Sequence, residues 1–150
     1  MNLTIRLQPK QSQLLELWND PKLTRIGFGG ARGGAKSGGG RRCMILRRLQ
    51  YANTTGLILR RTYPELYKSH IIKTFEEFPI MREWWNEQRK EFQFPNGSRL
   101  FMGSAEHEKD MAAFYSAEFA DIMPDEQIVV TTEEGEFDVY LWKAETLRAN

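Results

Sequence analysis

The sequence predicts an α/β fold, a three-layer core with a mainly parallel sheet. Short apolar segments typical of buried strands alternate along the chain with segments of helical periodicity. A glycine-rich loop at residues 29–37 (GGARGGAKS) separates the first strand candidate from a long basic helix candidate. An acidic pair, Asp125-Glu126, directly follows a later strand candidate. The loop and the acidic pair are therefore the candidate functional site.

Length and composition are those of a single globular domain. A chain of 150 residues is long enough to bury a sizeable core. The sequence contains no run of about 18 apolar residues, so no membrane span is expected. Its first ten residues lack the apolar core of a signal peptide. The single cysteine, Cys43, excludes an internal disulfide and suits a reducing compartment, and we expect it to be a small buried apolar residue.

The net charge of +1 hides an asymmetry between the two halves of the chain. Residues 1–63 contain twelve Lys and Arg against two acids, a net charge of +10. Residues 64–150 contain nine against eighteen acids, a net charge of −9. A basic half that contains a glycine loop favours polyphosphate, or a nucleic-acid backbone, as its partner. The alternative is a pair of solvated faces that partly neutralise each other.

The first half of the chain is expected to contain two helices. Residues 1–7 are expected to be extended or irregular, and Pro9 can open a helix over residues 11–18. A short buried strand is predicted at 24–28, and the next helix at 35–53, with Ile45, Leu49 and Ala52 inward. Its three consecutive glycines, residues 38–40, each cost about 1 kcal/mol inside a helix. Close backbone packing or a bound ligand must offset roughly 3 kcal/mol.

The second half is expected to alternate strands, helices and hairpins. A buried strand at 56–61 leads to a helix at 65–78, and a short helix is predicted at 81–90. Asn96-Gly97 between alternating apolar runs predicts a hairpin over 91–102. Residues 106–114 read as a short polar helix or loop, 118–123 as a strand, and 127–142 as a second hairpin.

Two further expectations concern the histidines and three aromatic residues of the second half. His70 and His107 are 37 residues apart without a cysteine partner, so we expect surface residues rather than a metal site. Trp84, Trp85 and Phe92 could stack on bases, but core packing is the better expectation.

The glycine loop has the composition of a phosphate-binding loop. The pattern G-x-x-x-x-G-K-[ST] is met from Gly30 onward, except that Ala35 replaces the second glycine. Backbone N–H groups of such a loop point at one anion at the positive end of the following helix. Lys36 would then reach the β- and γ-phosphates, and the Ser37 hydroxyl would ligate Mg²⁺. A flexible glycine-rich linker is the alternative, but it would not be followed by Lys-Ser between two apolar strands.

Asp125 and Glu126 complete a nucleotide site of this kind. An aspartate at the carboxyl end of a parallel strand can hold Mg²⁺, and the adjacent glutamate can polarise an attacking water. Pro124 is unusual just before the pair, because proline donates no ladder hydrogen bond. Asp121 is the competing candidate for the metal-binding aspartate.

Four stretches, in this order and spacing, resemble the ATPase domain of the tailed-phage terminase large subunit, the motor that packages DNA into proheads. They are residues 29–37 (GGARGGAKS), 59–66 (LRRTYPEL), 101–110 (FMGSAEHEKD) and 115–126 (YSAEFADIMPDE). The resemblance covers about residues 5–126. It implies a P-loop NTPase core of the RecA/ASCE-like type, here incomplete at the C-terminus.

The resemblance also implies roles for individual residues. Lys36 and Ser37 would bind phosphate and magnesium, Asp125 would bind magnesium, and Glu126 would activate water. Arg32 matches the basic residue of terminase phosphate loops that senses or stabilises the γ-phosphate. The remaining loop positions, Gly30, Gly33, Gly34 and Ala35, would contact the phosphates of ATP, and an alanine at position 35 occurs in some branches of the family. Gln11, in Pro9-Lys10-Gln11, looks like the upstream glutamine that reads adenine.

Partners and location follow from the same resemblance. ATP and Mg²⁺ are the expected cofactors, and double-stranded DNA, the portal protein and the small terminase subunit the expected partners, with no membrane involved. The full-length motor would form a homo-oligomeric ring in the host cytoplasm.

The C-terminal residues depart from the family pattern. Residues 1–126 correspond to a partial ATPase domain, whereas 127–150 read as a charged hairpin and helix without a coupling motif or nuclease acids. We therefore expect either a fragment of a larger coding region or an interrupted gene. A helicase-like P-loop ATPase and a non-catalytic nucleotide-binding remnant are the alternative functions.

Overall fold

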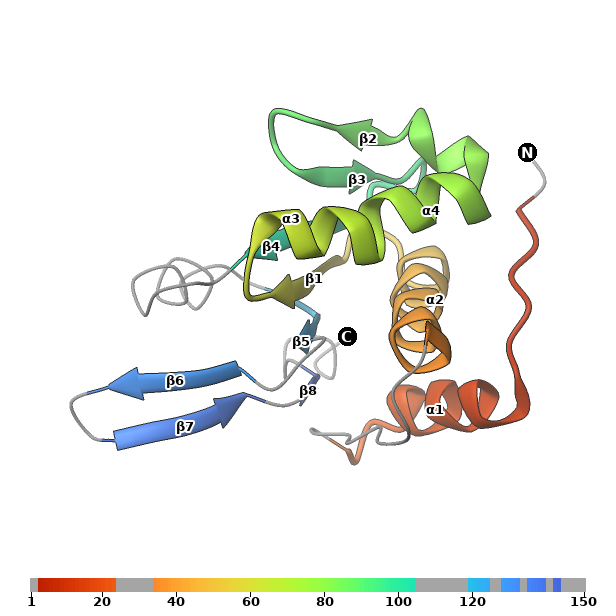
Figure 1. The fold of residues 1–150 in the computed structure, drawn as a ribbon. Helices are drawn as coiled ribbons and strands as arrows, with labels where there is room; N and C mark the ends of the chain where they lie inside the picture. The colour runs from red at the N-terminus through yellow and green to blue at the C-terminus, as the bar shows by residue number, and fades with distance from the viewer. Residues whose placement is uncertain are drawn as a thin grey trace.

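A computed structural model of the chain describes residues 3–23, 34–104, 119–124, 128–132, 135–139 and 142–143, with side chains for 3–23, 38–104 and 119–124 (Figure 1). The helical elements are α1 (Pro9–Asn19), α2 (Gly34–Gln50), α3 (Tyr63–Leu66), a π-helical turn (Tyr67–Ile71), α4 (Ile72–Glu77) and a 3₁₀ turn (Pro79–Arg82). The strands are β1 (Thr55–Arg60), β2 (Trp85–Asn86), β3 (Glu91–Gln93), β4 (Arg99–Ser104), β5 (Asp121–Pro124), β6 (Ile128–Thr132), β7 (Gly135–Val139) and β8 (Trp142–Lys143).

The fold is α/β with a mixed sheet whose centre is parallel. The main sheet has the order β2-β3-β4-β1-β5-β8. Strand β1 pairs in parallel with both β4 and β5, whereas the pairs toward β2 and β8 are antiparallel. Leu57, Ile58 and Leu59 of β1 are all buried, as expected of a central parallel strand covered on both faces. The predicted mainly parallel sheet is therefore confirmed for its core.

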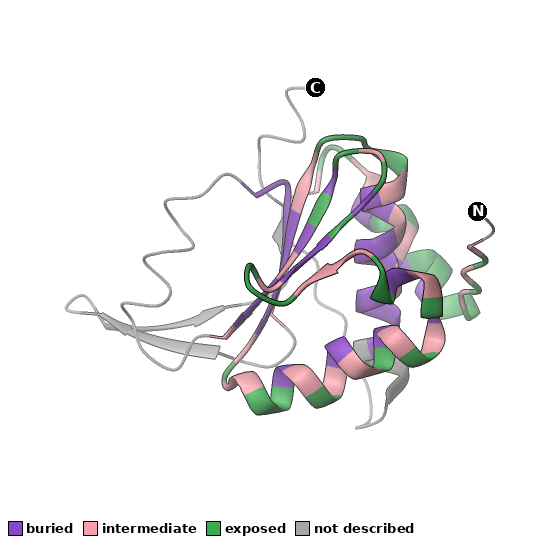
Figure 2. Cartoon of the chain, turned by 90° about the horizontal axis from the view of Figure 1, so that it is seen from above, coloured by how far each residue is buried: buried purple, intermediate pink, exposed green. Residues whose placement is uncertain are grey.

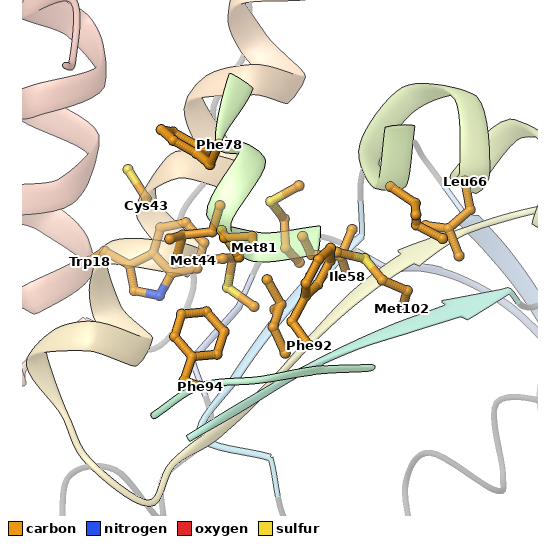
Figure 3. Packing of buried hydrophobic residues seen from close by; sticks show 14 of the residues in the cluster. Trp18, Cys43, Met44, Ile58, Leu66, Phe78, Met81, Phe92, Phe94 and Met102 are labelled. Atoms are coloured by element: carbon orange, nitrogen blue, oxygen red, sulfur yellow. The ribbon is translucent and has the colours of Figure 1, made fainter. Parts of the chain in front are cut away.

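The described helices lie along one face of the sheet (Figure 2). Ile58 of β1 is in register with Met102 of β4 and Met123 of β5, so these three side chains form a row on that face. Trp18 of α1 and Met44 of α2 pack over the row in one hydrophobic core (Figure 3). The described residues thus show two layers of the expected three-layer core. None of the described helices is long and apolar enough to cross a membrane.

Most predicted elements that fall within the described residues are present. Helix α1 begins at Pro9, as predicted. The hairpin predicted over 91–102 is the pair β3–β4, and the second predicted hairpin is the pair β6–β7. The helix predicted over 35–53 is α2, which ends at Gln50. Cys43 is buried as expected, and burial raises the pKa of its thiol to about 12.

The β3–β4 turn also fastens the end of α2. Gly97 has a φ of +86°, a backbone conformation that glycine adopts without strain. The side-chain Nδ2 of Asn96 donates to the carbonyl of Arg48 at 2.8 Å. This satisfies one of the C-terminal carbonyls that a helix leaves without a partner.

Two predictions about the second half were wrong, and predictions in both halves lie outside the described residues. Residues 81–90 do not form a short helix: Trp85 pairs with Phe92 across β2–β3, and the two rings lie 4.8 Å apart. His70 is fully buried rather than on the surface. The strand predicted at 24–28 and the segment at 106–114, with His107, lie outside the described residues.

Candidate functional site

The structure describes the frame of the predicted site more fully than its loops. Gly34, Ala35, Lys36 and Ser37 form the first turn of α2, for which only the backbone is described. Gly30, Arg32, Gly33, Asp125 and Glu126 lie outside the described residues. Gln11 is described and buried, with 1% of its surface exposed. Helix α2 and strand β5 carry the two halves of the predicted site, and their described residues fix how the two elements lie relative to each other.

Helix α2 runs antiparallel to β5. Near its C-terminal end, Arg47 and Arg48 contact Asp121, the first residue of β5. Seven residues earlier along the helix, Gly40 lies against Met123, two residues further along the strand. The direction from the amino end to the carboxyl end of β5 is therefore the direction toward the N-terminus of α2. The first turn of α2 and the carboxyl end of β5 point to the same end of the sheet.

The three consecutive glycines of α2, residues 38–40, are partly explained by this packing. A Cβ on Gly40 would lie 2.6 Å from Met123 Sδ, and one on Gly39 would lie 2.8 Å from Gln11 Cγ. Both distances are shorter than real Cβ contacts, so a side chain at either position would force the buried Met123 or Gln11 side chain to shift. On Gly38 the nearest described atom would be Arg41 Nη2 at an ordinary 3.8 Å. Close backbone packing therefore offsets the helix cost of two of the three glycines.

Alanine at Gly38 and at Gly40 should change stability in opposite directions. Gly38→Ala should raise the free energy of unfolding by about 1 kcal/mol, because alanine favours the helix and meets no described atom closely. Gly40→Ala gains the same propensity but overpacks against Met123, which costs about 1–3 kcal/mol, so we expect a net loss. Urea denaturation of both variants measures the difference. Equal stabilisation by both alanines would contradict the close α2–β5 contact.

Gln11 joins α1 to the second turn of α2. Its Oε1 accepts from the backbone N–H of Gln8 at 3.0 Å and from Arg42 Nη1 at 3.2 Å. The first contact caps the start of α1, in the manner of a capping box. The side chain also packs flat on the backbone at Gly39.

Arg42 extends this connection to α4. Its Nε and Nη2 donate to the two carboxylate oxygens of Glu77 at 2.9 and 2.7 Å, a bidentate pair. The hydrogen bond from Arg42 lowers the pKa of Glu77, and the same bond raises the pKa of Arg42. The neighbouring Arg41 donates to the carbonyl of Ser69 at 3.1 Å and approaches Glu77 at 3.9 Å. Two adjacent arginines thus hold α2 to the helical segment that follows β1.

A second buried cluster surrounds Asp121 at the opposite end of β5. One carboxylate oxygen accepts from Trp18 Nε1 at 2.9 Å, and the other accepts from Arg47 Nε at 2.9 Å and from Arg48 Nη2. Arg47 also donates to Asn19 at the end of α1. The cluster ties α1, α2 and β5 together. Gly56 leaves space for this cluster, because a Cβ at that position would overlap the Arg48 guanidinium.

These contacts assign Asp121 a structural role. Burial raises the pKa of its carboxyl, but the adjacent Arg48 and Arg47 outweigh burial and hold the pKa below its ordinary value. Asp121 is therefore a carboxylate whose two oxygens already accept from three side chains. It also begins β5 rather than following it. It does not suit the metal-binding role for which it competed with Asp125.

The π-helical turn lies beside the second turn of α2. It contains His70, whose Nδ1 is 3.4 Å from Arg41 Nη1. Its Ser69 accepts from Arg41 through the carbonyl and from Arg60 Nη1 through the hydroxyl at 3.0 Å. π-helical turns are rare and frequently occur at functional sites. Here the turn places His70 and Ser69 against Arg41.

Comparison of the chain with protein-family models, with curated protein sequences and with solved structures finds no match. Within the part of the chain that the structure describes, no three His, Cys, Asp or Glu residues are grouped as a metal site. The features that bear on function are therefore the loop sequence, the acidic pair and the geometry of α2 and β5.

Arg42 and Glu77 are not marked as a pair by any local pattern in the sequence. They are 35 residues apart, and each belongs to a segment in which charged residues suggest a solvated face. One signal could have found the first of them: Gly39 and Arg42 are three apart on α2 and so share a face. The glycine leaves room for a side chain from another element, here Gln11, and the arginine can donate a hydrogen bond to that side chain.

Proposed function

We propose that this chain is an ATPase module, a P-loop NTPase of the kind found in the tailed-phage terminase large subunit, which hydrolyses ATP with Mg²⁺. The observation that carries the proposal is the antiparallel packing of α2 on β5. Gly40 contacts Met123, and Ser37 precedes Gly40 by three residues, about 4.5 Å along a helix. Met123 is followed by Pro124, the last residue of β5, and Asp125 is the next residue in the sequence. A phosphate bound at the start of α2 would then face the acidic pair.

The chemistry of the residues supports the same proposal. The N-terminus of α2 carries the positive end of a helix dipole, which favours an anion. Within α2 no acidic residue lies in the first turn. The Ser37 hydroxyl and the Asp125 carboxylate are hard oxygen ligands of the kind that Mg²⁺ prefers. When bound, the ion would neutralise charge on the β- and γ-phosphates.

The protein's own residues would do the rest of the chemistry. Lys36 would hold the β- and γ-phosphate oxygens, and Arg32 would stabilise negative charge on the γ-phosphate in the transition state. Glu126 would orient a water in line with the γ-phosphorus and accept its proton. The scissile bond joins the γ-phosphorus to the β–γ bridging oxygen, so the products are ADP and inorganic phosphate. In a complete motor, with portal protein, small subunit and double-stranded DNA as partners, this hydrolysis would drive translocation.

Two substitutions separate binding from hydrolysis. Lys36→Ala should weaken Mg·ATP binding by at least about tenfold, because it removes a charge-assisted phosphate contact. Glu126→Gln should keep binding within about threefold while hydrolysis falls by about 10²- to 10⁴-fold. Isothermal titration calorimetry and a phosphate-release assay measure the two quantities.

Lys73→Ala, at an exposed position of α4, is the matched control and should change neither. Binding that survives Lys36→Ala unchanged would overturn the phosphate-loop assignment. Tight binding with no turnover, indifferent to Glu126→Gln, would instead favour a non-catalytic nucleotide-binding protein.

A further inference from the structure

The connection from Gln11 through Arg42 to Glu77 lies directly beside the proposed phosphate site. Gly39, on which the Gln11 side chain packs, is two residues after Ser37. Arg42 is one helical turn further along α2 and binds both Gln11 and Glu77. The connection thus fixes α2 against α1 on one side and against α4 on the other, immediately after its first turn.

The geometry of Gln11 conflicts with direct reading of a base. A carbonyl oxygen has two lone pairs, and Gln11 Oε1 already accepts from Gln8 N–H and Arg42 Nη1. An amide that reads adenine must offer both its oxygen and its nitrogen to the base edge. With 1% of its surface exposed, Gln11 would have to break both contacts and leave its place on Gly39 to do so.

We propose that Gln11, Arg42 and Glu77 are positioning residues that fix the start of α2 against α1 and α4, and that Gln11 does not select the base. The inference rests on the proposed nucleotide site. Its consequence is that these residues govern affinity for the triphosphate group. ATP, GTP and inorganic triphosphate, each with Mg²⁺, should therefore depend on Gln11 to the same extent.

Gln11→Ala and Gln11→Glu distinguish positioning from base reading. Alanine removes the acceptor and the packing on Gly39, so affinity for all three probes should fall by about tenfold. Glutamate keeps an acceptor for Gln8 N–H and Arg42 but has no amide N–H₂ to donate. We expect it to change all three affinities by the same factor, because none of the change comes from the base. Gln13→Ala, an exposed position on the same helix, is the matched control and should change none.

Arg42→Ala tests whether the three residues act together. It should reproduce the loss seen in Gln11→Ala for all three probes. The double variant should lose little more than either single variant, because both remove the same connection. All affinities are measured by calorimetry without denaturant, at a temperature where circular dichroism shows each variant fully folded.

The outcomes separate this inference from the proposed function. A loss confined to ATP in both Gln11→Ala and Gln11→Glu would establish base reading and overturn the inference while leaving the ATPase proposal intact. Variants that are less stable but keep wild-type affinity would show that these residues have a purely structural role. Fully additive losses of affinity in the double variant would show that Gln11 and Arg42 act independently. Either result overturns the inference. A wild-type chain that binds none of the three probes overturns the proposed function, and the inference with it.

Discussion

Asp121→Ala should lower the free energy of unfolding by about 3–5 kcal/mol. The substitution leaves the guanidinium groups of Arg47 and Arg48 buried, with 1% and 0% of their side-chain surfaces exposed and without their carboxylate. Burying an uncompensated charge is among the most destabilising changes in a protein interior. It also removes the acceptor of Trp18 Nε1. Urea denaturation measures the loss, and Glu16→Ala, an exposed acid on α1, should change stability by less than about 0.5 kcal/mol.

The pH dependence of this difference is part of the same prediction. The folded-state pKa of Asp121 lies below its ordinary value, which is about 3.9 in an unfolded chain. A carboxyl of this kind stabilises the fold above its unfolded pKa, and the stabilisation is lost as the pH falls through the folded pKa. The advantage of the wild type over Asp121→Asn should therefore be constant from pH 5 to pH 7 and shrink below about pH 4. An advantage that grows on acidification would contradict the assigned ion pairs.

Ion pairs between the two halves of the chain neutralise part of its charge asymmetry. Arg47 and Arg48 in the basic half pair with Asp121 in the acidic half, and Arg42 pairs with Glu77. From the sequence, this asymmetry predicts a polyphosphate or nucleic-acid partner, or two solvated faces. The structure adds a third component, in which opposite charges from the two halves pair with each other, buried at Asp121 and partly buried at Glu77. The basic charge left for an external anion is correspondingly smaller.

Local signals in the sequence were sufficient for several elements. Pro9 begins a helix because its fixed φ and missing N–H suit the first turn. Asn96-Gly97 forms the β3–β4 turn because Gly97 adopts a positive φ. The buried run at 57–59 marks the central strand, since a parallel strand is covered on both faces. In each case the determining interactions lie within a few residues.

Long-range contacts decide the features that the sequence analysis missed. Arg48 is buried because it meets Asp121, 73 residues away, and no local pattern marks that pairing. The expected inner face of α2 included Ala52, which lies beyond the helix and is exposed, in place of the buried arginines. His70 is buried because the π-helical turn places it against Arg41. Polar residues assigned to the surface by type alone became core residues through partners far along the chain.

Gly56→Ala should lower the free energy of unfolding by about 3 kcal/mol, the upper range for overpacking a buried site. A methyl group there would overlap the Arg48 guanidinium and lie 2.8 Å from Met44 Cε. Gly56 is also in register with Asp121 on the neighbouring strand, so the guanidinium fills the space above the glycine in order to reach that carboxylate. Displacing it separates the ion pair as well as overpacking the site.

The same pairing predicts non-additive behaviour between positions 56 and 48. Arg48→Ala removes the group that a methyl on Gly56 would overlap, so Gly56→Ala should cost at least about 1 kcal/mol less in that background than in the wild type. In a Lys73→Ala background, where an exposed α4 side chain is removed, its cost should be unchanged. Urea denaturation of the four variants of each cycle measures both coupling energies. Additive costs at positions 56 and 48 would mean that Gly56 is required for its backbone conformation and not for the guanidinium. A strand glycine and a helix arginine would then not build the buried Asp121 cluster together.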